Sequence, residues 1–216
     1  MAEYFAGKGY RVAGCSRGTS SIEKEGYCHT QVDVGDERQV QQWIRSIKND
    51  YQRIDVLVCN AGQASAALLL TMTSGDILES MLRTNVAGTY YVCREVAKVM
   101  ILQRSGRIIT VSSMAVGLHE KGTSAYSASK SAIVEMTKIL AKELAPFCIT
   151  CNVLAPSMIT TEAVAALGED VAASALEKLT IKRRLSIEEI CNVVSFFAAT
   201  ESACITGQVI HMGLVS

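Results

Sequence analysis

One pair of side chains has the types and spacing for acid–base chemistry. Tyr126 and Lys130 lie four residues apart near the start of an expected helix, which places them on one face about one turn apart. An ammonium group beside a phenol favours the phenolate and lowers the tyrosine pKa from its usual value of about 10 toward working pH. The pair therefore predicts a tyrosine that acts as a general acid or base.

Other candidate residues stand where expected strands end. They are Asn60-Ala61-Gly62, Ser112-Ser113 and Pro156-Ser157. In open α/β sheets, ligands bind outside the carboxyl ends of the strands. We therefore expect these residues and the Tyr126–Lys130 pair to share one site.

The elements that must position these residues alternate along the chain. Short apolar runs predict strands at 11–15, 27–32, 54–59, 107–112, 149–154 and 209–212. Amphipathic patterns predict helices at 37–49, 75–103, 124–144 and 187–199, the last opened by a Ser186–Glu189 capping box. Continuous apolar strands separated by helices predict one α/β domain over 1–216, with a doubly wound, mostly parallel sheet covered on both faces.

Composition excludes several classes of protein. Of 216 residues, 49% are hydrophobic, and 21 basic residues balance 21 acidic ones, so disorder is excluded. A neutral domain also argues against a basic nucleic-acid footprint. No apolar run reaches about 18 residues, so we expect no membrane span. The first eight residues lack the pattern of a signal peptide.

The eight cysteines do not form a pattern typical of secreted disulfide proteins or zinc sites. A chain of this length can build a core without disulfides, so we expect mostly buried, reduced thiols in a reducing compartment. Cys148 and Cys151 spell C-x-x-C, but in an expected strand an offset of three sends the sulfurs to opposite faces. No second such pair and no histidine spacing completes a metal site, so we predict none.

Taken together, these motifs resemble the short-chain dehydrogenase/reductase family. The similarity rests on Y-x-x-x-K, a serine (Ser113) thirteen residues before the tyrosine, and the N-A-G loop upstream. It extends to Asn85 in the expected long helix, to Asp33-Val34 after an early strand, and to 205–208 near the end. The resemblance covers nearly the whole chain and implies a Rossmann-like sheet.

The resemblance also implies catalytic roles. Tyr126 would exchange a proton with the substrate oxygen, and Ser113 would orient that carbonyl. Lys130 would hold the nicotinamide ribose and lower the tyrosine pKa, while Asn85 would anchor a water molecule in a proton relay. The cofactor supplies the hydride, and the protein supplies position and electrostatics.

Cofactor contacts are implied at several further positions. They are Ser16, Arg17, Asp33, Val34, Asn60, Ala61, Gly62, Tyr126, Lys130, Pro156, Ile159 and Thr161. Thr161 would reach the phosphates, and the Ile159 backbone the carboxamide. No acid follows the first strand to bond a ribose 2′-hydroxyl, whereas Arg17 beside Ser16 suits a 2′-phosphate, so we expect NADP(H). Ser157 replaces a glycine of the family pattern, which argues against a positive φ there.

The family's first strand and its glycine-rich turn, which receives the pyrophosphate, have no counterpart in this sequence. Gly7 and Gly9 instead indicate a helix end. The strand belongs between those at 11–15 and 54–59, and its absence leaves a gap of about 9.6 Å where pairing needs about 4.8 Å. Either these strands close up and pair, or backbone groups lack partners. We hypothesise a truncated gene model or splice form with weakened cofactor binding.

Among relatives, 3-oxoacyl-[acyl-carrier-protein] reductases and NADPH carbonyl reductases are the most similar. The expected activity is NADPH-dependent reduction of a 3-oxoacyl thioester in fatty acid synthesis. A quinone, steroid or secondary-alcohol oxidoreductase is an alternative, as is an impaired subunit that assembles with a full-length paralogue. The family's usual homotetramer implies a homotetramer or heterotetramer here, in the cytosol, or in the mitochondrial matrix if a targeting segment lies upstream.

Overall fold

The computed structural model describes residues 1–64, 67–159 and 169–215, with the backbone alone at 169–172. Within these residues the strands are β1 (Val12–Ser16), β2 (Tyr27–Gln31), β3 (Val56–Cys59), β4 (Gly106–Val111), β5 (Ile149–Pro156) and β6 (Val209–Met212). Every pairing between them is parallel. The predicted α/β class with a doubly wound parallel sheet is confirmed, and each strand begins and ends within about two residues of its predicted bounds.

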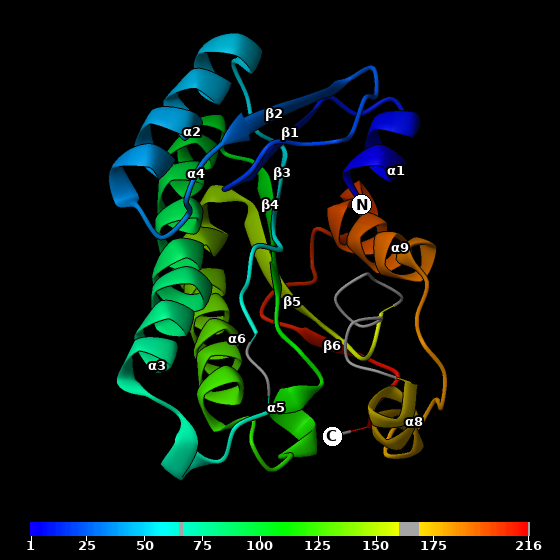
Figure 1. The fold of residues 1–216 in the computed structure, drawn as a ribbon. Helices are drawn as coiled ribbons and strands as arrows, with labels where there is room; N and C mark the ends of the chain where they lie inside the picture. Colours follow the sequence, from blue (N-terminus) through cyan, green and yellow to red (C-terminus); the bar gives the residue numbers. More distant parts are fainter. Residues whose placement is uncertain (65–66, 160–168, 216) are drawn as a thin grey trace.

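Helices cover the strands on two sides, as Figure 1 shows. One layer contains α2 (Glu37–Tyr51), α3 (Gly75–Met81), α4 (Thr89–Gln103) and α6 (Ser124–Leu144). The other contains α1 (Ala2–Gly7) and α9 (Ile187–Ala198), with α8 (Glu169–Glu177) below them in the view. The short α5 (Ala115–Leu118), which sequence reasoning missed, follows β4, and 3₁₀ turns lie at Leu70–Met72, Ala145–Phe147 and Thr200–Ser202.

Several local signals act as expected. The Ser186–Glu189 capping box is present, with Ser186 Oγ accepting from the Glu189 N–H at 3.2 Å. Gly9, at φ +86°, follows the end of α1, which confirms the predicted helix end. The helix predicted at 75–103 is not one α-helix, however. A π-helix at Leu82–Gly88 separates α3 from α4.

The core lies between the helices and the C-terminal strands. Every residue of β5 is buried, as are five of the six residues of β4. The cysteines are all free, but they are less buried than predicted. Cys59, Cys93, Cys151 and Cys191 are buried, whereas Cys28, Cys148 and Cys204 are exposed. Cys148 also precedes β5 rather than lying in it. Of the two cysteines in the C-x-x-C sequence, Cys148 is therefore exposed and Cys151 is buried.

The strands do not form one continuous sheet. β1 pairs only with β2, and the order β3-β4-β5-β6 forms a second sheet. Between β1 and β3 lies a cavity of about 920 Å³, lined by residues of both strands. The strands β1 and β3 have therefore not closed up, and within the described part of the chain their facing backbone edges lack sheet partners. We call this cavity the inter-sheet slot.

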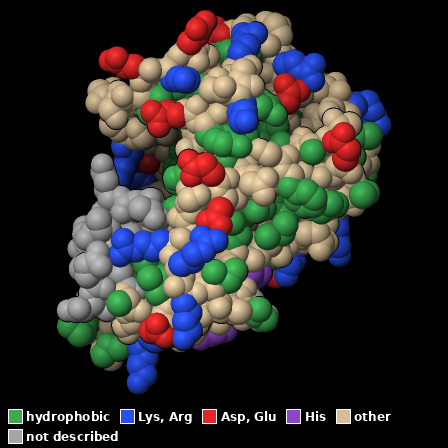
Figure 2. All heavy atoms as spheres, turned by 90° about the vertical axis from the view of Figure 1, so that its right-hand side faces the viewer, with side chains coloured by type: hydrophobic (Ala, Val, Ile, Leu, Met, Phe, Trp, Pro, Cys, Tyr) green, Lys and Arg blue, Asp and Glu red, His purple; other side chains and the backbone are tan. Residues whose placement is uncertain are grey.

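The surface carries both signs of charge. On the face shown in Figure 2, basic and acidic side chains are interspersed with hydrophobic ones, and neither sign gathers into one patch. This agrees with the balanced composition. Among the described residues, no helix combines the length and the apolar content that crossing a bilayer requires.

Candidate functional site

The tyrosine of the predicted acid–base pair stands in the first turn of α6, and Ser113 follows the end of β4. The Ser113 side chain lies close enough to the Tyr126 phenol for hydrogen bonding between them to lower the pKa of that phenol. Burial raises the pKa of Tyr126, and the bond from Ser113 lowers it by less, so the net shift is upward. The pKa of Tyr126 is thus not lowered as expected: Lys130 is not among the groups that shift it, and desolvation of the phenol raises it.

Lys130 lies beneath the tyrosine on the same helix face. Its side chain is buried, with Nζ 5.9 Å from the Tyr126 ring centroid, and Nζ donates to the Val111 carbonyl at 2.9 Å. Burial lowers the pKa of this ammonium to about 8. Ser112 is buried beside it and donates to the Lys130 carbonyl at 3.1 Å, so it fixes the helix on the strand rather than facing the tyrosine.

Asn85 sits in the π-helix and is fully buried. Its Oδ1 accepts from the Gln63 N–H at 2.7 Å, and its Nδ2 donates to the Gln63 carbonyl at 2.9 Å. Nδ2 also donates to Ser129 Oγ at 2.9 Å. Both amide hydrogens are thus in use, and the side chain ties the loop after β3 to α6. A π-helical turn at such a position is typical of functional sites.

A second group of predicted residues lines the inter-sheet slot. These residues are Ser16, Arg17, Asp33, Val34, Asn60, Ala61 and Gly62. Two contacts connect this group with the cluster formed by Ser113, Tyr126 and Lys130. Gln63, which Asn85 holds, also lines the slot, and a Cβ on Gly62 would stand 3.1 Å from Lys130 Nζ. The cluster and the mouth of the slot are therefore adjacent.

At the mouth of the slot, where β1 and β3 end, the polar side chains differ in how many hydrogen bonds they already make. Asp33 Oδ1 accepts from the Gly35 N–H at 2.9 Å, and Oδ2 accepts from Arg83 at 2.8 Å. Ser16 Oγ donates to the Gly18 carbonyl at 3.0 Å and lies 2.9 Å from His29 Nε2. Arg17 is exposed. Of these, Arg17 is the cation that could meet a phosphate.

The residues predicted after β5 lie apart from the slot. The Pro156 carbonyl accepts from the Met114 N–H at 3.0 Å, which holds the segment after Ser113 against β5. Ile159 forms an isolated bridge with Leu185. Ser157 is buried and does not adopt a positive φ, as its side chain requires. Thr161 lies outside the described residues.

Three residues of the site were not predicted. Gln63 and Ser129 hold Asn85, and His29 contacts Ser16. The sequence held a signal for His29, because two neighbouring parallel strands place it in register with Gly14, close to Ser16. Gln63 and Ser129 carried none, since their contact depends on the π-helical turn that brings Asn85 inward.

An α/β fold with a Tyr–Lys–Ser cluster near the carboxyl ends of parallel strands defines a Rossmann-like oxidoreductase. The family model described as enoyl-(acyl-carrier-protein) reductase matches residues 1–213. The chain belongs to the short-chain dehydrogenase/reductase family, which confirms the resemblance.

Relatives and solved structures agree with this assignment. A 3-oxoacyl-[acyl-carrier-protein] reductase FabG of Thermotoga maritima is 38% identical over 187 residues, which cover 85% of this chain and 75% of that protein. The FabG of Escherichia coli is 31% identical over 98% of this chain and 89% of its own length. The structure of ElxO with NADP bound is similar at a TM-score of 0.90 and 29% identity, covering 97% of this chain and 89% of that chain.

The described residues fit the ends of such a dinucleotide better than its middle. Arg17 and Ser16 at the mouth of the slot suit a phosphorylated ribose, and Lys130 with Tyr126 suits the reacting end. The interior of the slot, behind this mouth, is walled by apolar side chains such as Trp43 and Val96, which offer nothing to a diphosphate. Thr161, the residue expected at the phosphates, is outside the described chain.

Proposed function

We propose that this protein is an NADP(H)-dependent oxidoreductase that reduces a carbonyl to a hydroxyl, with a 3-oxoacyl thioester as substrate. The proposal rests on the closeness of the Ser113 side chain to the Tyr126 phenol, with Lys130 beneath the tyrosine ring. Two neighbouring hydroxyl groups can donate together to one substrate oxygen, which is where negative charge develops during carbonyl reduction.

In this mechanism each residue has a separate task. Ser113 orients the carbonyl and donates a hydrogen bond to its oxygen. Tyr126, neutral because burial raises its pKa, gives that oxygen a proton. Lys130 is mostly protonated at pH 7, since its pKa is about 8, and its charge stabilises the phenolate that remains. Asn85 fixes the loop beside them, and the bound cofactor supplies the hydride.

The choice of NADP(H) over NAD(H) is supported by the residues at the slot mouth. β1 ends without an acidic residue that could bond a ribose 2′-hydroxyl, and Arg17 follows it. A guanidinium matches a 2′-phosphate in charge and geometry. ElxO has been solved with NADP bound, and a variant of it with NADPH bound.

Substrate class is supported by the names of the relatives. Both FabG proteins are 3-oxoacyl-[acyl-carrier-protein] reductases, whereas the matching family model is described as an enoyl reductase. These activities share the thioester and differ in whether C=O or C=C is reduced. The paired hydroxyls of Ser113 and Tyr126 favour C=O.

The test is NADPH oxidation, followed by absorbance, with acetoacetyl and crotonyl thioesters in parallel. We expect turnover of the oxo substrate, and Tyr126→Phe should lower it by about 10²- to 10⁴-fold without weakening NADPH binding. Activity that survives in Tyr126→Phe would show that the tyrosine is not the acid. Turnover of crotonyl thioester alone would favour the enoyl reaction. NADPH binding with neither activity would leave quinones, steroids and secondary alcohols to be assayed.

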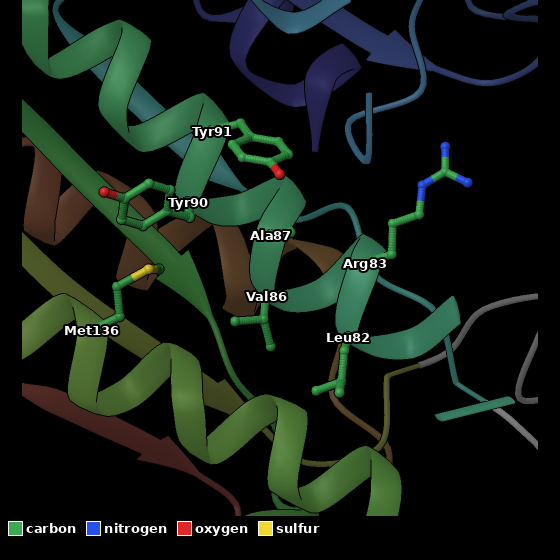
Figure 3. Close-up of a pocket in the computed structure, with 7 residues that line it drawn as sticks. All are labelled: Leu82, Arg83, Val86, Ala87, Tyr90, Tyr91 and Met136. Carbon is green, nitrogen blue, oxygen red and sulfur yellow. The ribbon is translucent and has the colours of Figure 1, made fainter. Parts of the chain in front are cut away.

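We also propose that α4 and α6 form a subunit interface in a homotetramer, or in a heterotetramer with a paralogue. An apolar groove of about 500 Å³ runs along the π-helix and the start of α4 beside α6, and Figure 3 shows Tyr90 opposite Met136, with Val86 and Leu82 further along the same side. Leu82 and Tyr90 are 39% and 48% exposed, which is unusual for large side chains that line one groove. Light scattering after Tyr90→Glu should report dissociation. A mass unchanged by that substitution would argue against this interface.

A further inference from the structure

Two cysteines from distant segments of the chain meet inside the core, beside the candidate site. Cys59 is the last residue of β3, and Cys93 lies in α4. Their Sγ atoms are 3.6 Å apart, and both residues are buried. We call these two residues the β3–α4 thiol pair. Neither sulfur takes part in the carbonyl reduction proposed above, so the pair is available for chemistry of its own.

The two thiols differ in which of them holds its proton more tightly. The Sγ–Sγ contact is a hydrogen bond, and that bond, followed by burial, raises the pKa of Cys93 well above its usual value. Cys93 therefore keeps its proton and donates it to the Cys59 sulfur, which accepts. Because a donated hydrogen stabilises negative charge on the accepting atom, Cys59 is the member of the pair that reacts as a thiolate.

Lys130 supplies a positive charge near the same sulfur. Burial lowers the pKa of this ammonium group, and its attraction to Cys59 offsets part of that lowering. The attraction is mutual, so the ammonium group also favours a negative charge on Cys59. A neighbouring lysine is typical of cysteines that react as nucleophiles.

The two thiols also differ in access. Cys59 is 8% exposed and is followed by the exposed residues Asn60 and Ala61, whereas Cys93 is 1% exposed. Hydrogen peroxide is little larger than water, so it reaches a sulfur at the edge of the core that a peptide-sized oxidant does not reach. Cys59 therefore meets the oxidant first, and Cys93 lies behind it, where a resolving thiol is needed.

We propose that the β3–α4 thiol pair is a modification site, at which hydrogen peroxide forms a disulfide bond between Cys59 and Cys93. The Cys59 thiolate attacks one peroxide oxygen, an S–O bond forms, and the O–O bond breaks. Cys59 becomes a sulfenic acid, and the departing hydroxide takes the proton of Cys93 and leaves as water.

The second step closes the disulfide. The Cys93 thiolate attacks the Cys59 sulfur, the S–O bond breaks, and the S–S bond forms. The hydroxide released here takes up the proton that Cys59 had lost. In sum, two thiols and one hydrogen peroxide give one disulfide and two water molecules, so the sulfurs are oxidised and the peroxide is reduced. This modification is independent of the proposed function.

Peptide mapping of the full chain by mass spectrometry tests the proposal without cofactor or substrate. Cleavage after lysine and arginine places Cys59 in the peptide 54–83 and Cys93 in the peptide 84–94, and neither peptide contains another cysteine. The folded protein is treated with hydrogen peroxide, and its free thiols are then blocked. We expect the two peptides to be joined, with a mass two hydrogens below their sum, and to separate again in dithiothreitol.

The exposed cysteines report whether the peroxide has acted. They are Cys28, Cys148 and Cys204. If Cys59 and Cys93 are still free thiols in protein whose exposed cysteines are oxidised, the proposal is overturned. A disulfide that joins either of them to another cysteine overturns it as well.

Alanine variants test the order of the two steps. In Cys93→Ala, peroxide should leave a sulfenic acid on Cys59, which dimedone traps, whereas in Cys59→Ala the Cys93 thiol should stay reduced. Cys151→Ala is the matched control, because Cys151 is buried in the same core cluster, and it should form the disulfide as the wild-type protein does. Oxidation of Cys93 in Cys59→Ala, or absence of the disulfide in folded Cys151→Ala, would contradict the assignment.

The disulfide should also affect the loop after β3, and this consequence rests on the proposed function. Sulfurs in a disulfide are about 2.05 Å apart, so the pair must close by about 1.5 Å. Cys59 directly precedes the loop that ends at Gln63, which Asn85 holds, so closing the pair pulls on residues expected to bind the cofactor.

Fluorescence titration with NADPH of the reduced and the oxidised protein measures this consequence. We expect affinity at least about tenfold lower after oxidation, and recovery in dithiothreitol. Equal affinities would show that the disulfide does not displace the loop. A reduced protein that does not bind NADPH would count against the proposed function, whereas the peptide map decides the modification site by itself.

Discussion

β5 and β1 are both parallel strands, yet their surroundings differ. All eight residues of β5 are buried, and the strand pairs with β4 on one side and β6 on the other. No residue of β1 is fully buried, and only its β2 side is paired. The cluster of Ser113, Tyr126 and Lys130 belongs to the continuous sheet around β4 and β5, whereas the expected dinucleotide residues line the inter-sheet slot. In the proposed function, the proton transfer and the binding of the cofactor therefore depend on two regions of which only the first has a complete sheet.

The sharpest way to test this contrast is to make the same truncation in both regions. Leu154→Ala in β5 removes a fully buried side chain and should lower the free energy of unfolding by about 3–5 kcal/mol. Leu57→Ala in β3 should cost only about 1–2 kcal/mol, because Leu57 is half-buried and already borders the slot. Urea unfolding at 25 °C measures both. Equal losses would mean that the slot is closed in solution.

Sequence reasoning succeeded where a local pattern determines the structure. The helix at 124–144 and the last strand at 209–212 begin and end where predicted, because their apolar periodicity agrees with the packing. It failed at Leu82–Gly88, since nothing in a helical pattern reveals an extra residue in one turn. The outcome at the slot also required coordinates, because closure or separation of β1 and β3 depends on how the flanking helices pack.

The site shows the same division. Spacing along one helix was enough to place Tyr126 and Lys130 together, and a strand end was enough for Ser113. The sign of the tyrosine pKa shift was not predictable, because it depends on how much burial removes water from the phenol. The partners of Asn85 likewise come from distant segments that only the fold brings together.

The pH dependence of stability tests the burial of Lys130 against the sheet around β4 and β5. Its pKa falls from 10.5 to about 8 on folding, so between these values the unfolded chain binds more protons and stability rises with pH. Lys130→Met should abolish turnover yet raise the free energy of unfolding at pH 7 by up to about 3 kcal/mol. That gain should shrink between pH 8 and 10.5.

Measuring the difference between the two proteins at each pH isolates Lys130. Burial raises the pKa of Cys15 to about 11 and that of Cys151 to about 12, so these thiols lower stability at high pH, but they do so in both proteins. A gain that is independent of pH would mean that the buried charge is not its cause.

Variants of two buried asparagines can distinguish an effect on the site from an effect on the stability of the fold. Asn85 holds Gln63, and Asn152 donates to the Ile205 carbonyl at 2.8 Å and accepts from the Gln208 N–H at 3.0 Å. Alanine at either position should cost about 2 kcal/mol of stability. Turnover should fall by at least about tenfold only in Asn85→Ala, because only that clasp positions the loop beside Lys130. Equal turnover losses would make Asn85 merely structural.

The region around β4 and β5 has buried polar atoms without hydrogen-bond partners among the described residues, and Ser157, which follows β5, gives the smallest expected effect. Ser157 Oγ is buried without a hydrogen-bond partner among the described residues, and it faces Gly213, where an added Cβ would lie 2.5 Å from it. Ser157→Ala removes the unpaired hydroxyl and should stabilise the protein by about 0.5–1 kcal/mol. Ser112→Ala, which removes a bonded hydroxyl, should instead destabilise it by about 1 kcal/mol. Thermal unfolding of both variants measures the signs, and a loss of stability in Ser157→Ala would mean that its hydroxyl has a partner in solution.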